Sequence, residues 1–479
     1  MLRSLPERLV LFEVAYDIKK NLTLVRIIES WATTENPFNT TEEILKWIDK
    51  KNKNTHVTIQ RIPYQYDGFW YYDDQSGEIK NRNGSFFQIK GIKKTTSNGV
   101  EEQPVVIQNE IGYLGIIGKV FDGVLYFLMQ AKIEPGNVNK IQISPTIQAT
   151  KSNFMKAHGG KAPAYLEYFS NKKNYEIVAD QIQSEQSSRF LGKRNRNIIV
   201  VVDDDIPVLE SHKWMTLGQI KDLMKYDNLV NMDTRTVFSC IPFSLRDFTF
   251  KELTHVKGLF KRESLFNSMF FGEAGTRINK IFQYVNEYKM LDKSTTELVD
   301  LYSLKNWAFN ENGEYTSPHA DFRIVFCNIE IEGREVQKWQ QPLLAANGES
   351  IFGLLYCVEN NMMQFLIKAK SEIGCFDKIE IGPSVQLGPN EKAENHIEEL
   401  FVEKLKNNKD IEFQGLFSEE GGRFYHEQNR NVIMKMEKEE IGALPEGYFW
   451  TDFQTINVLI QFNNCLNIQL RNLISILDL

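Results

Sequence analysis

The chain contains few of the residues that build disulfide frameworks and metal centres. Its 479 residues include 5 cysteines and 7 histidines, and no two cysteines have C-x-x-C spacing. An odd number of scattered cysteines favours neither a disulfide framework nor a structural zinc site. We therefore expect a protein of a reducing cytoplasm that needs no metal and no other cofactor.

Long apolar runs and an excess of positive charge are also missing. No run of about 18 apolar residues is present, so we expect no membrane-spanning helix. The net charge of −7 argues against nucleic acid as a partner. H-E-x-x-H, P-loop and G-x-G-x-x-G motifs are absent, which argues against metal, nucleoside triphosphate and nicotinamide chemistry. The 42% hydrophobic and 25% charged residues are typical of an ordinary globular protein.

A long internal repeat is what the sequence does contain. The stretch GIIGKVFDGVLYFLMQAKIEPGNVNKIQISPTIQ (115–148) returns 238 positions later as GLLYCVENNMMQFLIKAKSEIGCFDKIEIGPSVQ (353–386), with 13 of 34 positions identical. The shared residues are not only apolar, because Lys132, Glu134 and Gly136 recur as Lys370, Glu372 and Gly374. This pattern indicates that a site was duplicated together with its scaffold.

Further blocks extend each copy to about 200 residues, the size of a domain. SEQSSRFLGKRNRN (184–197) matches SEEGGRFYHEQNRN (418–431) at 7 of 14 positions, and N-x-x-N-x-x-x-R occurs in both copies. Strand and helix patterns alternate, so we expect an α+β fold in which each copy is an α/β/α sandwich with added helices. The expected parts are a helical segment (1–55) belonging to the first module, the rest of that module (56–242), an inter-module segment (243–275) and a second module (276–479).

The inter-module segment is rich in Phe, Leu and Met, with Lys and Arg between them. Such a helix can lie on a membrane surface. Packing between the modules or between subunits explains the same apolar faces more simply, and it is the interpretation we favour.

Local signals place two hairpin turns and one helix start. Asp122-Gly123 and Asn360-Asn361 are expected to join the strands of a hairpin in each copy, because tight hairpin turns need positive φ. The run TTEEILKWIDKKNK is expected to be helical, with Thr40 or Thr41 as its capping residue.

Polar residues kept in both copies are candidate ligand-binding groups. The first copy has Lys132 and Glu134 after a hairpin strand, and Glu185, Arg189, Asn195, Arg196 and Asn197 in or before the strand RNIIVVV. Arginine binds phosphate oxygens in pairs, Glu and Asn suit sugar hydroxyls, and Trp70 or Trp307 could stack on a base. These Arg and Glu residues could equally pair with each other and hold the repeat together.

His158, in KAHGGKAP, is the histidine most suggestive of a site. The two glycines that follow it permit close approach of a ligand to the backbone. The second copy has no counterpart of this His-Gly-Gly. A loop histidine without a role in chemistry is the alternative.

Several of these motifs together resemble the nucleoside-diphosphate hexose 2,3-dehydratases of deoxysugar biosynthesis. They are LMQAKIEPGNVNKIQISPTIQATKSNF with HGG and YLEYF, SEQSSRF, KRNRN and LVNMDTRTVFSCIPF, then QPLL, PSVQ, SEEGGRF and YFWTDFQTINVLIQFNN in the second half. The resemblance covers the chain from about Trp70 onward. It implies a lyase that acts on dTDP-4-keto-6-deoxy-D-glucose, and a homodimer whose subunits carry two Nudix-hydrolase-like modules each.

The metal-binding box of true Nudix hydrolases is missing from both copies. A glycine followed by R-E-x-x-E-E is replaced by SPTIQATKSNFMKAHGG in the first and GPSVQLGPNEKAENH in the second. Binding of a sugar nucleotide can remain when the carboxylates for Mg²⁺ are lost. A Nudix-type sugar-nucleotide hydrolase and a non-catalytic nucleotide-sugar-binding protein are the competing hypotheses.

The reaction that the resemblance implies, taken together with the repeat, suggests roles for individual residues. We expect catalysis in the first module, which keeps His158 and Lys193, whereas the second has Glu427 in place of Lys193. Glu185 is the candidate base, His158 the candidate acid and Lys132 the candidate partner of an enolate oxygen. Glu185 could instead be an ion-pair partner of Arg189 or Arg196, since Glu419 repeats it. The expected substrate-binding residues are Trp70, Glu134, Gln148, Asn153, Arg189, Asn195, Arg196 and Asn197, and the expected ancillary second pocket contains Trp307, Lys370, Gln386, Glu419, Arg423 and Arg430.

Overall fold

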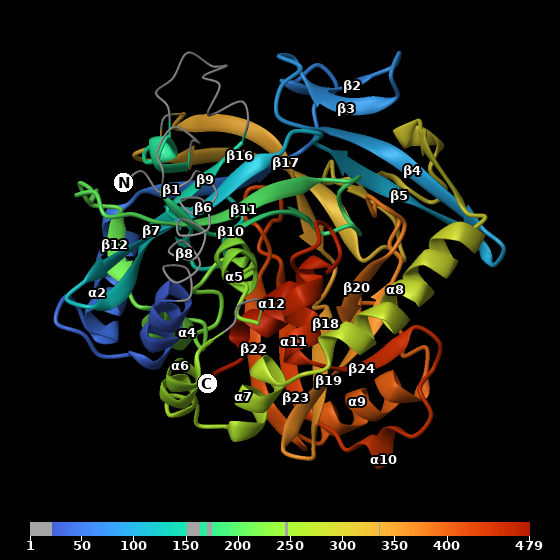
Figure 1. The fold of residues 1–479 in the computed structure, drawn as a ribbon. Coiled ribbons are helices and arrows are strands. Elements are labelled where there is room, and N and C mark those ends of the chain that lie inside the picture. The colour runs from blue at the N-terminus through green and yellow to red at the C-terminus, as the bar shows by residue number, and fades with distance from the viewer. Residues whose placement is uncertain (1–21, 151–162, 170–174, 245–247, 335) are drawn as a thin grey trace, which may run out of the picture.

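The computed structural model describes residues 22–150, 163–169, 175–244, 248–334 and 336–479. These residues form two sheets of seven strands and two of five, together with helices, so the predicted α+β class is confirmed (Figure 1). None of the helices in these ranges is long and apolar enough to cross a membrane.

The first seven-stranded sheet is built from the first half of the chain. Its main path is β10-β11-β6-β7-β12, with β11 and β6 parallel and the other neighbours antiparallel. Strand β8 pairs with β7, and β9 pairs with β6. The strands are β6 (Gly112–Phe121), β7 (Val124–Ile133), β8 (Ile141–Ser144), β9 (Ile147–Ala149), β10 (Glu176–Ser184), β11 (Arg194–Val201) and β12 (His212–Met215).

The second seven-stranded sheet has the same pairings in the second half of the chain. Here β18 pairs with β19, β21 and, in parallel, β23, while β19 also pairs with β20 and β24 and β23 with β22. The strands are β18 (Ile351–Glu359), β19 (Met362–Lys370), β20 (Glu380–Pro383), β21 (Val385–Leu387), β22 (Ile411–Ser418), β23 (Gln428–Lys435) and β24 (Tyr448–Asp452).

The two five-stranded sheets exchange one strand between the halves. Strand β1 (Val57–Ile62) pairs with β16 of the second half, and β13 (Thr295–Val299) pairs with β4 of the first. Each half therefore completes a sheet of the other. The remaining strands are β2 (Trp70–Asp73), β3 (Glu78–Asn81), β4 (Gln88–Thr96) and β5 (Gly99–Ile107), and β14 (Ala308–Phe309), β15 (Tyr315–Thr316), β16 (Phe322–Ile331) and β17 (Lys338–Ala346).

The helices pack one hydrophobic core that both halves share. The helices α5 (Met232–Ser239) and α12 (Ile468–Ile476) contact each other between the two large sheets at the centre of Figure 1. The core runs from Leu24 to Leu479 and includes side chains of both sheets. Residues 22–32 are also helical. The other helices are α2 (Thr41–Asn54), α4 (Leu217–Leu223), α6 (Phe250–Lys257), α7 (Glu263–Phe270), α8 (Ala274–Leu291), α9 (His396–Lys406), α10 (Lys438–Ile441) and α11 (Phe453–Leu459), with 3₁₀ turns η1 (Leu166–Phe169) and η2 (Leu301–Ser303).

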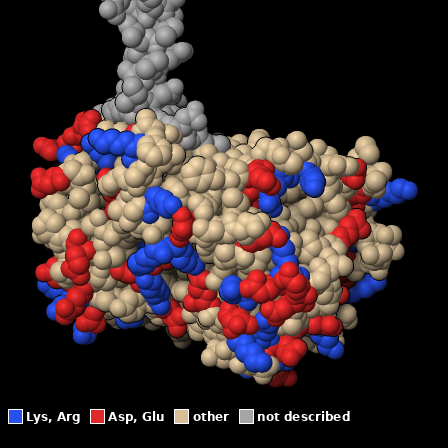
Figure 2. Space-filling model, turned by 60° about the horizontal axis from the view of Figure 1, so that its bottom comes forward, with Lys and Arg blue, Asp and Glu red and all other residues tan. Residues whose placement is uncertain are grey.

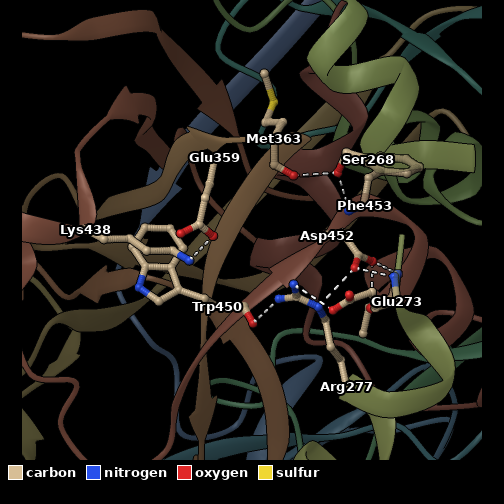
Figure 3. Close-up of polar contacts among 10 residues, drawn as sticks. Ser268, Glu273, Arg277, Glu359, Met363, Lys438, Trp450, Asp452 and Phe453 are labelled. Carbon is tan, nitrogen blue, oxygen red and sulfur yellow. Dashed lines mark hydrogen bonds and ion pairs between the residues drawn. The ribbon is translucent and has the colours of Figure 1, made fainter. Parts of the chain in front are cut away.

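The described part of the inter-module segment packs against both halves, as favoured from its sequence. Val256, Leu265, Phe266 and Met269 are buried in the shared core. Figure 3 shows Ser268 of α7 between strand β19 and the start of helix α11. It donates to the Met363 carbonyl at 2.6 Å and accepts from the Phe453 N–H at 2.7 Å.

Asp452 ties the following helix α8 to the second sheet (Figure 3). Its buried carboxylate accepts from the Glu273 N–H at 2.8 Å and pairs with Arg277 Nε at 3.1 Å. It also caps α11 by accepting from the Thr455 N–H at 2.7 Å.

On the face drawn in Figure 2, Lys and Arg side chains are interspersed with Asp and Glu side chains.

The local predictions are confirmed. Asp122 and Gly123 have φ of 48° and 85°, and Asn360 and Asn361 have 49° and 57°. Thr40 forms a capping box with Glu43 at the start of α2.

The repeated glycines after β7 and β19 lie where the halves come closest. Gly136 N–H donates to the Gly421 carbonyl at 2.7 Å, and Gly374 N–H donates to the Ser187 carbonyl at 2.9 Å. A Cβ on Gly136 would overlap the Phe424 carbonyl oxygen, and a Cβ on Gly374 would overlap that of Phe190. These glycines are therefore required by contact between the halves.

We expect Gly136→Ala to lower the free energy of unfolding by about 2–4 kcal/mol, because the new methyl group meets backbone that cannot move aside cheaply. Urea unfolding measures the change. The control is Gly275→Ala in α8, where a Cβ meets nothing within 4 Å and the helix gains propensity. Equal stability of the two variants would contradict this account of the repeated glycine.

Candidate active site

A cavity of about 660 Å³ opens where the first large sheet meets loops of the second half. Side chains of β6, β7 and β11 line it, as do Trp339 to Gln341, Glu420 and Arg423 from the second half. Aromatic rings at Phe69, Phe86 and Trp339 accompany the charged groups. The site is thus composite, and neither half of the chain encloses it alone.

An ion pair occupies one wall of the cavity. Lys132 and Glu134, two residues apart at the end of β7, point to the same side of the strand, and their charged atoms are 2.5 Å apart. Arg334 lies 3.6 Å from the other oxygen of Glu134. Burial opposes ionisation of Glu134, but Lys132, Arg334 and Arg423 hold the pKa of this carboxyl below its ordinary value. Glu134 is therefore a fixed anion and Lys132 is its partner.

Glu185 follows β10 directly and is buried beside the cavity. Asn195, at the start of β11, donates to Glu185 Oε1 at 2.5 Å. The other oxygen, Oε2, has no hydrogen-bond partner among the described residues. Burial and the nearby Glu420 raise the pKa of Glu185 to about 7, although Lys193 and Arg471 favour the charged form. A carboxylate with one free oxygen and a pKa near neutrality is suited to act as a general base.

Asp233, which we did not single out from the sequence, also lines the cavity. It belongs to the first turn of α5 and is 1% exposed. Neither of its oxygens has a hydrogen-bond partner among the described residues. Burial, Glu185 and Glu420 raise its pKa well above the ordinary value. Asp233 stands at one of the x positions of N-x-x-N-x-x-x-R, and the second copy has Gln469 there. A comparison that selects residues identical in both copies therefore does not identify it.

The loops after β10 and β22 cross into the opposite halves. Arg423 of the second half stacks over Phe87 of the first, 4.3 Å from the ring centroid, and donates to Gln108 Oε1 at 3.1 Å. Arg189 of the first half stacks over Phe322 of the second at 4.2 Å. Of the two repeated arginines, it is thus Arg423 that lines the cavity containing Glu185.

Several other predicted residues lie around this cavity. Gln148 and Asn195 line it, and Trp70 contributes to its wall while its indole N–H donates to the Gln340 carbonyl at 2.7 Å. His158 and Asn153 fall outside the described residues.

Three predicted binding residues do not line this cavity. Arg196 pairs with Asp180 at 2.6 Å, so the guanidinium is held along the sheet. Asn197 is buried and donates to the Asn195 carbonyl at 3.1 Å. The side chain of Arg189 reaches into the second half, where it stacks over Phe322.

The residues predicted for a second pocket make mostly internal contacts. Gln386 donates to Glu372 Oε1 at 2.8 Å, where the first half has the Lys132–Glu134 pair. Glu419 accepts from Asn429 at 2.5 Å, and Arg430 pairs with Glu349 at 2.6 Å. Trp307 packs in an aromatic core with Tyr315 and Phe322. Burial raises the pKa of Glu372, and Lys370, at the end of β19, partly opposes that rise.

A cavity lined by a fixed ion pair, a carboxyl with a pKa near neutrality and two arginines is typical of an enzyme that performs acid–base chemistry on a small anionic ligand. The family model for NDP-hexose 2,3-dehydratases matches residues 41–241 and again 278–477. The chain therefore belongs to the NDP-hexose 2,3-dehydratase family.

Three relatives carry the name dTDP-4-dehydro-6-deoxy-alpha-D-glucopyranose 2,3-dehydratase. The protein of Saccharopolyspora spinosa is 33% identical, with 94% of each chain covered. That of Amycolatopsis orientalis is 32% identical over 95% of this chain and 93% of the relative. That of Streptomyces violaceoruber is 31% identical over 90% and 95%. Similarity on this scale spans both halves of the molecule.

Buried glutamates make stability depend on pH, and Glu427 tests this. Burial raises its pKa to about 7, and neither oxygen has a partner among the described residues. Between the ordinary pKa of 4.5 and the folded-state pKa of about 7, the folded state binds more protons at Glu427 than the unfolded state does. The free energy of unfolding therefore decreases as the pH rises through that window.

We expect Glu427→Gln to match the parent at pH 5 and to exceed its free energy of unfolding by about 2 kcal/mol at pH 8, where the parent must bury a charge. Chemical unfolding at the two pH values gives the difference. Glu403→Gln, at an exposed position of α9, is the control and should show no such change. A Glu427→Gln protein that is less stable than the parent at pH 8 would show that the charge is compensated.

Proposed function

We propose that the chain is a dTDP-4-keto-6-deoxy-D-glucose 2,3-dehydratase, a hydro-lyase of deoxysugar biosynthesis. It would eliminate water across carbons 2 and 3 and yield a dTDP-3,4-diketo-2,6-dideoxyhexose. The observation that carries the proposal is that one cavity of this family member is lined by the Lys132–Glu134 ion pair and by Glu185, whose Oε2 has no hydrogen-bond partner among the described residues. Within the described ranges no group of His, Cys, Asp and Glu is arranged to hold a metal ion.

The substrate's ketone determines what the protein must supply. A carbonyl at carbon 4 acidifies the proton on carbon 3, so a single base can remove it and form an enolate. Glu185 is the proposed base, because its Oε2 has no partner within the described part of the chain and its pKa of about 7 leaves part of the population ionised at neutral pH. Lys132 is the proposed partner of the enolate oxygen, since an ammonium in a buried site stabilises developing negative charge.

The anionic diphosphate needs cations at the cavity. Arg334 and Arg423 line it, and we assign them to the diphosphate in place of Arg189 and Arg196. Gln148 and Asn195, which line the cavity, are the proposed contacts to the sugar, and Trp70 forms part of the cavity wall. His158, suggested from the sequence as the acid, lies outside the described residues, so these contacts support only the base and the binding groups.

The wider organisation follows the same proposal. Each large sheet, with its flanking helices, would be a Nudix-hydrolase-like module, at 56–242 and 276–479, with 1–55 belonging to the first and 243–275 between them. The identical pairings of the two sheets support this assignment. We further propose a cytoplasmic homodimer that is metal-independent and binds neither nucleic acid nor membrane.

Catalysis is assigned to the first module because the two sites differ in charge. Lys193 and Glu420 line the first cavity. The residue equivalent to Lys193 in the repeat is Glu427, and the residue equivalent to Glu420 is Gln186. The second site, around Lys370 and Glu419, would be ancillary. In this proposal the residues present in both copies maintain the shared scaffold, and the residues that differ between the copies determine which site is catalytic.

Mass spectrometry of the sugar nucleotide tests the function. After incubation of dTDP-4-keto-6-deoxyglucose with the protein, we expect loss of one water, with EDTA present or absent. Release of thymidine monophosphate that depends on Mg²⁺ would favour the hydrolase hypothesis. Binding of dTDP without any change in the sugar would favour a binding protein.

For Glu185→Gln we expect turnover to fall by at least about 100-fold and exchange of the carbon 3 proton with deuterated solvent to stop, while dTDP still binds. The amide keeps the acceptor for Asn195 but cannot take a proton. Glu419→Gln, at the corresponding position of the other half, is the matched control and should retain activity. Persistent exchange in the Glu185 variant would assign the base to another residue.

The arginine exchange gives a second matched pair. Arg423→Ala should raise KM for the sugar nucleotide by about 10-fold or more, since a charge-assisted contact contributes roughly 1.5–3 kcal/mol. Arg189→Ala removes an equivalent stacking contact from the opposite half and should lower thermal stability to a similar degree with a smaller effect on KM. Equal changes of KM would show that both arginines act through the fold.

A further inference from the structure

Asp233 combines three features that a purely structural aspartate rarely has. It is 1% exposed, it lines the cavity, and both of its carboxyl oxygens lack a hydrogen-bond partner among the described residues. A buried polar group without a partner costs roughly 1–3 kcal/mol. Such a cost at a cavity wall indicates a group that is kept for a ligand.

The charged groups around Asp233 determine its protonation state. Three carboxyls act on it, those of Glu185, Glu420 and Glu134, and the cations Lys132, Arg235 and Arg471 oppose them. Burial and these carboxyls raise the pKa of Asp233 well above its ordinary value. These surroundings favour the protonated form of Asp233, which has a proton to donate.

The second half contains the same frame without the acid. Asn231 and Arg235 of α5 correspond to Asn467 and Arg471 of α12, and both pairs make the same kinds of contact. Between them the second half has Gln469 in place of Asp233, also buried and also without partners for its amide. An amide fills the space but cannot supply a proton, so the difference concerns chemistry.

We propose that Asp233 is the catalytic acid that protonates the hydroxyl leaving from carbon 2, an assignment that rests on the proposed function. Glu185 takes the proton of carbon 3, and the electron pair of that bond forms the enolate next to Lys132. Collapse of the enolate forms the bond between carbons 2 and 3 and breaks the bond from carbon 2 to oxygen, which leaves as water with the proton of Asp233.

The second half of the reaction restores both groups. The hydroxyl on carbon 3 of the enol gives its proton to the Asp233 carboxylate, while Glu185 returns its proton to carbon 2. The product is the 3,4-diketo-2,6-dideoxy sugar, and no oxidant or further reactant is needed. Acid and base are thus regenerated within one turnover.

Asp233→Asn separates this role from the others, because asparagine resembles the neutral acid in size and charge. Dehydration should fall by at least about 100-fold, while Glu185 still exchanges the carbon 3 proton with deuterated solvent. An analogue with fluorine in place of the hydroxyl at carbon 2 expels fluoride, a leaving group that needs less help from an acid. With that analogue the loss relative to the parent should shrink to under about 10-fold.

The controls keep the result interpretable. Gln469→Met, which keeps the size of the corresponding side chain in the second half, should retain dehydration. Should the asparagine variant not fold, Asp233→Ala is assayed in the same way. Dehydration that survives in Asp233→Asn, or a loss that fluoride does not reduce, would overturn the assignment. A parent protein that removes no water at all would instead overturn the proposed function.

Discussion

Two buried arginines, each reaching from one half of the chain to the other, hold the geometry on which the site depends. Arg235 donates to the Ser418 carbonyl at 3.2 Å, and Arg471 donates to the Ser184 carbonyl. Each of these carbonyls immediately precedes the repeated glutamate, Glu419 or Glu185. A guanidinium costs several kcal/mol to bury unless its donors are satisfied, and here backbone carbonyls satisfy them. The loop that carries Glu185 is therefore positioned by the opposite half, together with the exchanged strands β1 and β13 and the glycines that let the loops touch.

This exchange explains how a nearly symmetric frame can hold two unequal sites. The residues that fix the backbone are the same in both halves, so the frame tolerates no drift at Gly136 or Gly374 without overlap of the chains. Residues that face the first cavity differ from their counterparts in charge. Lys193 corresponds to Glu427, so one charge is reversed, and Asp233 and Glu420 correspond to the amides Gln469 and Gln186. Duplication supplied the scaffold twice, and the charge differences are concentrated at the groups that line one cavity.

The elements governed by local chemistry could be predicted from the sequence. The turn at Asp122-Gly123 follows from the positive φ that a tight hairpin demands, and the helix start at Thr40 follows from its capping box. The exchange of Arg189 and Arg423 could not be predicted, because a residue present in both copies says nothing about which cavity it enters. Asp233 was missed for the opposite reason, since agreement between the copies selects residues of the frame. Arg196 was assigned to a ligand although Asp180, on the paired strand, neutralises it.

The division of charge within the cavity follows from the number of cations available to the buried carboxyls. Glu134 has Lys132 at 2.5 Å and Arg334 at 3.6 Å, so it remains ionised despite burial. For Glu185, Asp233 and Glu420 the nearby cations do not offset burial and the neighbouring carboxyls, and each of the three has a raised pKa. Like charges in a poorly screened site cannot all ionise together, so ionisation of one carboxyl stabilises the proton on its neighbour. An acid and a base made from the same functional group can therefore coexist at neutral pH. In the second half two of these three positions are amides, and the carboxyl that acts on Glu419 is that of Glu427, which takes the place of Lys193.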